Sequence, residues 1–162
     1  MKNIAVKRIS KDLRLLVEDV HACSEAKSTH GTESAVIVAV DADSTYTWTL
    51  KVKAPTDSIY GGADSVYQLS VLFSEDYPHE PPMVRFVTAI YSPLVTKEGG
   101  ICDRMVRINW TPDQHVSDAI HLVLDSVFSQ YKNCHENDVY PEARYCLDNY
   151  PQEFAERVRR GH

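Results

Sequence analysis

The first twenty residues carry apolar side chains at helical spacing. Basic residues fill the positions between them, and this alternation predicts an amphipathic helix over residues 2–20. The next stretch, residues 21–33, is small and polar and predicts a loop. The apolar stripe consists of Ile4, Ile9, Leu13, Leu16, Val17 and Val20.

Four runs rich in β-branched and aromatic residues follow. Short segments with turn-forming residues separate them, "ADS" after the first run and the longer "PTDSIYGGADS" after the second. Consecutive strands joined by such turns predict an antiparallel meander. The predicted strands are residues 34–41, 45–54, 66–73 and 83–87.

Regular periodicity is lost between residues 89 and 112. Irregular segments of this length inside a compact domain are usually functional. A strongly apolar helical pattern returns at 116–128, and a loop at 129–137 leads to a helix near 139–149 and a last helix from Pro151. We therefore expect a single domain over residues 1–162, of the α+β class: an N-terminal helix, a four-stranded antiparallel meander, an irregular active-site segment and C-terminal helices.

Composition and charge remove several classes of function. The formal net charge of −6 disfavours nucleic-acid binding. No apolar run reaches the ~20 residues that span a bilayer, and the N-terminus lacks the apolar stretch of a signal peptide, so we expect no membrane partner and a cytoplasmic or nuclear location. Four dispersed cysteines without a CxxC pair predict neither a disulfide framework nor a metal site.

Cys102 is the best-placed reactive group. Signatures of serine hydrolases, kinases and P-loop enzymes are absent, and Cys102 follows a Gly-Gly pair inside the irregular segment. An ordinary cysteine is a strong nucleophile that is a few per cent thiolate at neutral pH. The alternative is a small buried packing residue.

A proline-rich motif leads into the fourth strand. "YPHEPPMVRF", residues 77–86, holds three prolines that stiffen the chain. Cys102 comes sixteen residues after the motif, and Trp110-Thr111-Pro112 comes eight to ten residues after Cys102. This arrangement, together with "KRISKDLRLL", "PTDSIYGG" and "VYPEA", resembles the ubiquitin-conjugating enzymes over the whole chain.

The resemblance implies an ATP-dependent pathway of modifier transfer. Cys102 would accept ubiquitin, or a ubiquitin-like modifier, as a thioester from an activating enzyme. It would then pass the modifier to the lysine of a protein substrate or to a RING or HECT-type ligase, with no cofactor. The resemblance gives Trp110 a packing role beside the site, and the pattern of the second strand gives Trp48 one in the core or on a face of the sheet.

The chain departs from the family at the catalytic loop. Ser92, Pro93 and Leu94 occupy the positions of a usual His-Pro-Asn triplet, whose Asn stabilises the oxyanion or holds the loop. Loss of one oxyanion donor costs ~10²–10³ in rate, so we expect slow transfer to lysine and a faster reaction in Leu94→Asn. Ser92, Asn109 and backbone N–H groups near Cys102 are the candidate replacement donors.

The family's acidic gate near the acceptor lysine falls on Asn137, beside Glu136, in a loop about three residues longer than usual. Asn137 can bind an ammonium group but cannot act as a base.

Docking positions also follow from the resemblance. Lys7, Arg8 and Lys11 match residues that meet the activating enzyme, although a merely solvated face explains them equally well. His79 and Pro112 match ligase-contacting positions.

Two alternatives to a ubiquitin enzyme stay open. "YPHEPP", "EGG" and "RRGH" are similar to the neddylation branch, but the N-terminal extension typical of that branch is missing. A catalytically weak module that only binds ubiquitin or a partner would explain the loss of the Asn, but such a module usually lacks the cysteine that is present here as Cys102.

Overall fold

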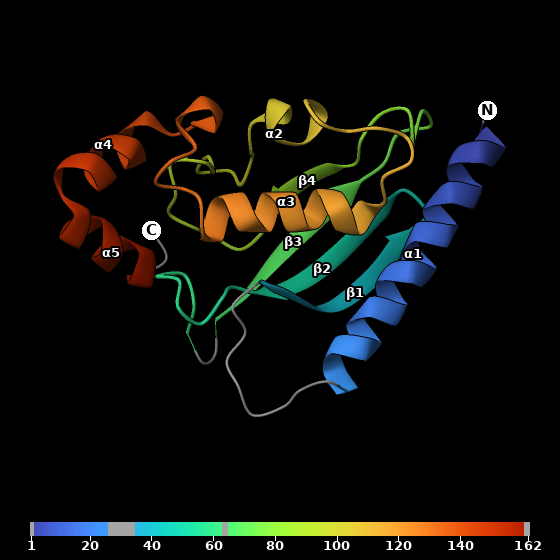
Figure 1. Cartoon of the computed structure of the whole chain (residues 1–162), viewed down its shortest axis with the longest axis horizontal. Helices are drawn as coiled ribbons and strands as arrows, with labels where there is room; N and C mark the ends of the chain where they lie inside the picture. Colours follow the sequence, from blue (N-terminus) through green and yellow to red (C-terminus); the bar gives the residue numbers. More distant parts are fainter. Residues whose placement is uncertain (1, 26–34, 63–64, 161–162) are drawn as a thin grey trace.

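The computed structural model describes residues 2–25, 35–62 and 65–160 (Figure 1). One helix precedes four strands, which pair antiparallel in the order β1-β2-β3-β4. This confirms the predicted meander and the α+β class. The elements are α1 (Lys2–Glu25), β1 (Val36–Ser44), β2 (Thr47–Lys53), β3 (Val66–Leu72) and β4 (Met83–Phe86).

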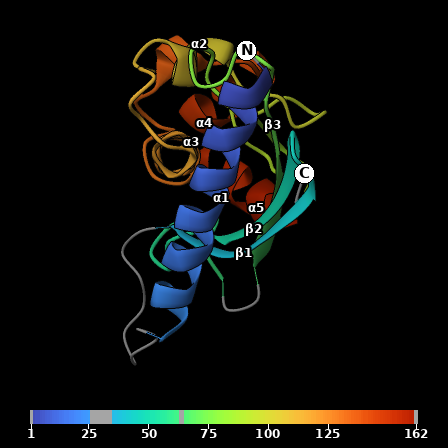
Figure 2. The same ribbon diagram turned by 90° about the vertical axis from the view of Figure 1, so that its right-hand side faces the viewer.

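The remaining helices follow the sheet in sequence. They are α2 (Asp103–Arg107), α3 (Val116–Phe128), the 3₁₀ helix η1 (His135–Asn137), α4 (Pro141–Asn149) and α5 (Pro151–Arg160). Figures 1 and 2 show α1 and α3 on the same side of the sheet, with α4 and α5 at one end of the molecule. In the described part of the chain, no helix is long and apolar enough to cross a membrane.

One face of the sheet is covered by helices. Trp48, Leu50 and Val52 alternate along β2 and are fully buried, whereas Lys51 between them is exposed. These side chains belong to the same buried cluster as the apolar face of α3, where the ring of Phe128 packs against Phe86 from β4. The predicted buried helix at 116–128 is therefore confirmed at both ends, and so is the core position of Trp48.

Three predicted boundaries are wrong. Helix α1 continues to Glu25, through the start of the predicted loop at 21–33, whose later residues lie outside the described ones. β1 continues through the "ADS" segment because Ala42 still pairs with Trp48, and the two-residue turn falls at 45–46. Inside the predicted irregular segment 89–112 lies α2, which is too short to show a helical period.

The buried face of α1 also differs from the predicted stripe. Ile4 is 57% exposed, whereas Ala5, Ile9, Asp12 and Leu16 are buried. The buried face includes Asp12, a charged residue that apolar periodicity cannot select. Its partners come from distant segments and are described with the site.

Candidate active site

Cys102 immediately precedes α2 and is partly exposed. Its backbone is extended, with φ −65° and ψ 125°, and its carbonyl accepts a hydrogen bond from Met105 N at 3.0 Å. The thiol is free. Cys102 is therefore held at its backbone and accessible at its side chain, unlike a buried packing cysteine.

A cavity of about 380 Å³ contains Cys102. One wall comes from the loop before β4, with Pro81 and Pro82, and the other from residues 100–107. Pro82 is buried and Pro81 half-buried, so the proline motif forms a stiff wall facing the nucleophile. Two arginines, Arg85 and Arg107, and two carboxylates, Glu80 and Asp103, leave the lining without a net charge.

Gly99 explains the Gly-Gly pair before Cys102. Its φ is +91°, and a Cβ placed there would lie 1.8 Å from the carbonyl oxygen of Phe86. The Gly99 carbonyl accepts from Phe86 N at 2.8 Å, and Thr96 N donates to Gly100 O at 2.9 Å. The pair therefore serves a close backbone approach between the end of β4 and the turn that precedes Cys102.

The Ser92-Pro93-Leu94 triplet is packed into the protein. Ser92 and Leu94 are both 0% exposed, and Leu94 N donates to Ser92 Oγ at 3.1 Å. Pro93 O accepts from Val139 N at 2.9 Å and from Tyr140 N at 3.1 Å. This placement does not support Ser92 as an oxyanion donor, because its hydroxyl lies inside the protein and closes the local turn.

Asn109 and Asn137 lie outside the cavity of Cys102. Asn109 is exposed beyond α2, and Asn137 is half-buried in η1. Neither side chain has a hydrogen bond to another described residue. Their supporting roles stay predictions.

The other described thiols are poorer nucleophile candidates. Cys146 is buried. Burial, followed by the negative charge of Glu136, raises the pKa of the Cys134 thiol and disfavours its thiolate. Cys102 therefore remains the best-placed thiol in the described part of the chain. No cluster of His, Cys, Asp and Glu side chains there could hold a metal ion.

A buried charge cluster joins α1 to the segment after α2. The side chain of Asp12 is fully buried and lies 2.7 Å from His115 Nδ1 and 3.3 Å from Arg8 Nε. The Tyr77 hydroxyl donates to its second oxygen. Burial, and next the bond to Asp12, raise the pKa of Tyr77, so that its hydroxyl stays a neutral donor.

The cluster engages one of the three predicted docking residues on α1. Arg8 donates to Pro112 O at 2.7 Å and to the Gln114 carbonyl, so its guanidinium is engaged within the chain. Lys7 and Lys11 are exposed and pair with no described residue, which leaves them free to meet a partner.

The same region joins the two loops that carry His79 and Pro112. Trp110 Nε1 donates to Pro78 O at 2.8 Å, and its ring lies 6.0 Å from that of Tyr77. His79 and Pro112 are both exposed on the two loops that this contact joins. Trp110 thus has the packing role predicted for it.

The buried charge cluster around Asp12 leaves little trace in the sequence, where only the i,i+4 spacing of Arg8 and Asp12 points to it.

Known proteins are similar to this one over most of the chain. Residues 10–162 match the family model described as ubiquitin-conjugating enzyme. An Arabidopsis thaliana protein named "Probable ubiquitin-conjugating enzyme E2 31" is 29% identical over 127 residues, 78% of this chain and 79% of its own length. A solved structure titled "Ubiquitin conjugating enzyme (putative) from Trypanosoma cruzi" is 65% identical, with a TM-score of 0.89 over 94% of this chain and 96% of that chain.

Proposed function

We propose, because the chain belongs to the ubiquitin-conjugating enzyme family, that Cys102 accepts ubiquitin as a thioester from an activating enzyme and passes it on. Membership of the family implies a transferase that meets a modifier, an activating enzyme and ligases. The choice of ubiquitin, the identity of the nucleophile, and a cytoplasmic or nuclear site of action belong to the proposal.

The placement of Cys102 carries the proposal. Its free thiol is partly exposed beside a cavity whose walls are a buried proline motif and a turn fixed by Gly99. The Cys102 thiolate attacks the carbonyl carbon of the activating enzyme's thioester, a C–S bond forms, and the activating enzyme's thiolate leaves. In the second step an amine or a ligase thiol attacks the same carbon, the amine or thiol loses its proton, and Cys102 leaves as a thiolate.

The second step has fewer hydrogen-bond donors for the oxyanion than the sequence suggested. The side chains of Ser92 and Leu94 are both buried and neither lines the cavity of Cys102, which speaks against either as an oxyanion donor. The donors then come from backbone N–H groups near Cys102, from Asn109, or from a partner. We expect transfer to a ligase thiol to depend less on such donors than transfer to free lysine.

Non-reducing gels test the proposal. The protein is incubated with activating enzyme, ATP and ubiquitin, and in parallel with the neddylation modifier and its activating enzyme. A thiol-sensitive adduct should form with ubiquitin, disappear in Cys102→Ser, and persist in the matched control Cys134→Ser. An adduct only with the neddylation modifier would reassign the branch. The absence of an adduct with either modifier would contradict the enzyme hypothesis and favour a binding module.

A further inference from the structure

A second cavity, of about 640 Å³, lies between residues 89–97 and α5. Its volume is in the range of ordinary ligand sites. Three cations, Lys97, Arg157 and Arg160, line it, against a single carboxylate, that of Glu153. The cavity is therefore positive in a protein whose formal net charge is −6.

Aromatic rings hold two of these cations at the rim. Lys97 Nζ lies 5.8 Å from the ring centroid of Tyr140, and the Arg157 guanidinium lies 5.3 Å from that of Tyr91. Arg157 Nη1 also donates to the Tyr91 hydroxyl at 3.0 Å. Tyr91 is only 4% exposed, so it is a fixed anchor for Arg157.

The charge of the cations is poorly compensated within the chain. Arg157 Nε lies 3.9 Å from Glu153, an exposed and loose pair. Among the described residues, Lys97 and Arg160 have no carboxylate within 4.0 Å. Lys97, which a ring positions and no carboxylate neutralises, is therefore suited to binding an anion from outside, and Arg160 adds a second uncompensated charge.

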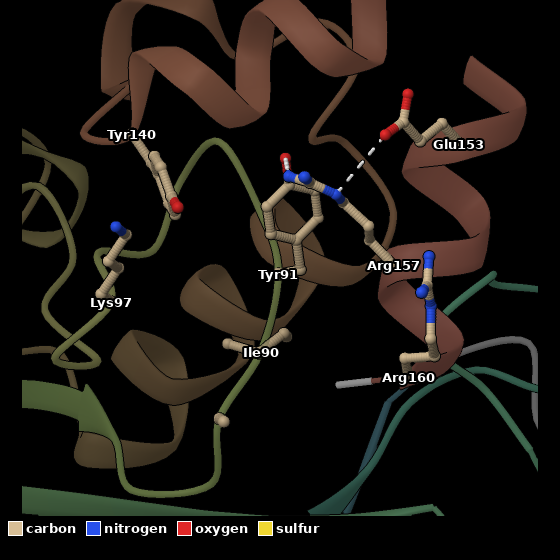
Figure 3. Close-up of a pocket in the computed structure, with 8 residues that line it drawn as sticks. Ile90, Tyr91, Lys97, Tyr140, Glu153, Arg157 and Arg160 are labelled. Atoms are coloured by element: carbon tan, nitrogen blue, oxygen red, sulfur yellow. Dashed lines mark hydrogen bonds and ion pairs between the residues drawn. The ribbon is translucent and has the colours of Figure 1, made fainter. Parts of the chain in front are cut away.

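The positions of the cations indicate the shape of that anion. Figure 3 shows Lys97 on one side of the cavity and Arg160 on the other, with Ile90 and Tyr91 between them. Cations at two ends of a cavity fit an extended chain with acidic side chains along it better than one compact phosphate. The negative charge of the whole protein disfavours a nucleic acid or an anionic membrane.

The cavity also lies close to Cys102 along the chain. Lys97 belongs to the turn that ends at Gly100, and the bridge between Val95 and Ile101 closes this turn directly before Cys102. Lys97 and Cys102 are five positions apart, so their Cα atoms are at most ~18 Å from each other. An acidic segment on Lys97 would thus lie within a few residues of a lysine presented to Cys102.

We propose that this cavity binds a short acidic peptide segment, and that during transfer the segment flanks the acceptor lysine of the substrate. The second half of this inference rests on the proposed function, whereas the binding itself does not. The site selects substrates by charge: Lys97 and Arg160 pair with carboxylates, and the half-buried Ile90 contacts the chain between them.

Peptide binding tests the site without any catalysis. The probes are a fluorescein-labelled peptide with one lysine and a run of glutamates, and the same peptide with glutamines in their place, followed by fluorescence polarisation at low and at moderate salt. The acidic peptide should bind the wild type more tightly than the glutamine peptide. Lys97→Glu and Arg160→Glu should each weaken it by about three- to tenfold, and Glu153→Gln should tighten it.

The matched control is Lys51→Glu, the same change of charge on the exposed face of β2. It should leave the affinity within about twofold at moderate salt, since Lys51 does not line the cavity and exposed charges are screened there. Equal affinity for the two peptides, or an equal loss in Lys51→Glu, would overturn the inference. Binding of inorganic pyrophosphate without binding of the acidic peptide would also overturn it, in favour of a small phosphate ligand.

A transfer assay then separates this inference from the proposed function. The Cys102 thioester should discharge faster onto the acidic peptide than onto the glutamine peptide, and Lys97→Glu should abolish the difference. If the wild type forms no thioester, the proposed function fails, and the polarisation result alone decides on the site. If thioester forms but the two peptides discharge it equally, the role of the site in substrate choice fails.

Discussion

Replacement of Asp12 by alanine should destabilise the protein far more than replacement of an exposed acidic residue on α1. The carboxylate is fully buried and accepts hydrogen bonds from Tyr77 and His115 while pairing with Arg8. Removing one partner of a buried ion pair costs about 3–5 kcal/mol, because the remaining charge is left uncompensated. The carbonyls of Pro112 and Gln114 still accept from Arg8 in the variant, so the lower end of this range is the better expectation.

Urea denaturation followed by circular dichroism measures the effect. Asp12→Ala should lower the free energy of unfolding by about 3 kcal/mol with an unchanged m-value. Tyr77→Phe, which removes one hydrogen bond to the carboxylate and keeps the ring, should cost about 1.5–3 kcal/mol. Asp19→Ala, an exposed acid on the same helix, should stay within about 0.5 kcal/mol of the wild type.

A loss below about 1 kcal/mol in Asp12→Ala would refute the reasoning. It would mean that the cluster is solvated in solution, or that its desolvation cost already equals its attraction. A large loss of unfolding free energy in Asp19→Ala would instead show that any acidic residue on α1 stabilises the protein, whether or not it has the buried contacts of Asp12.

Three further predictions concern the active-site segment and its surroundings. Gly99→Ala should destabilise the protein by at least ~1–2 kcal/mol from its positive φ alone, and the clash with Phe86 O adds to this. Gly62→Ala, whose added carbon meets only the Ser65 side chain, should cost less, and thermal melts compare the two variants. Leu94→Asn should destabilise the protein by about 3 kcal/mol or more and fail to accelerate discharge of the thioester onto lysine, because position 94 is buried in the core. A folded variant with faster discharge would instead support the sequence-based expectation that Asn at this position speeds transfer. Burial raises the pKa of Tyr60, so the folded state keeps the hydroxyl proton to a higher pH than the unfolded state does. The stabilisation is complete below pH ~10 and is lost as the pH rises above it. Urea titrations between pH 8 and 11 should show the free energy of unfolding falling with pH, and Tyr60→Phe should make this fall shallower.

The fold followed from local patterns wherever those patterns were long. The period of α3 and the alternation of β2 each cover enough residues to fix an element and its buried face. Short or polar signals failed: the five residues of α2 show no period, and "ADS" reads as a turn although pairing with β2 extends the strand through it. Pairing across strands is a tertiary contact, which a local pattern does not contain.

The candidate site divides in the same way. Cys102 and the proline motif are visible in sequence because their spacing is regular and their chemistry is unusual. The cluster around Asp12 is not, since Tyr77 and His115 are 65 and 103 residues away from it along the chain. The burial of Ser92 is not visible either, because sequence does not show on which side of a loop a hydroxyl lies.

The substitution at position 94 is better explained by packing than by loss of a donor alone. Leu94 fills a core site, Ser92 closes the turn with its hydroxyl, and Pro93 O binds two backbone N–H groups from the segment before α4. The loop is therefore held by apolar burial and by backbone hydrogen bonds, so holding it does not require an amide side chain. What this arrangement cannot provide is a side-chain donor to an oxyanion on Cys102. A loop that is rigid but lacks that donor should form its thioester at an ordinary rate and depend on a partner for the step that follows.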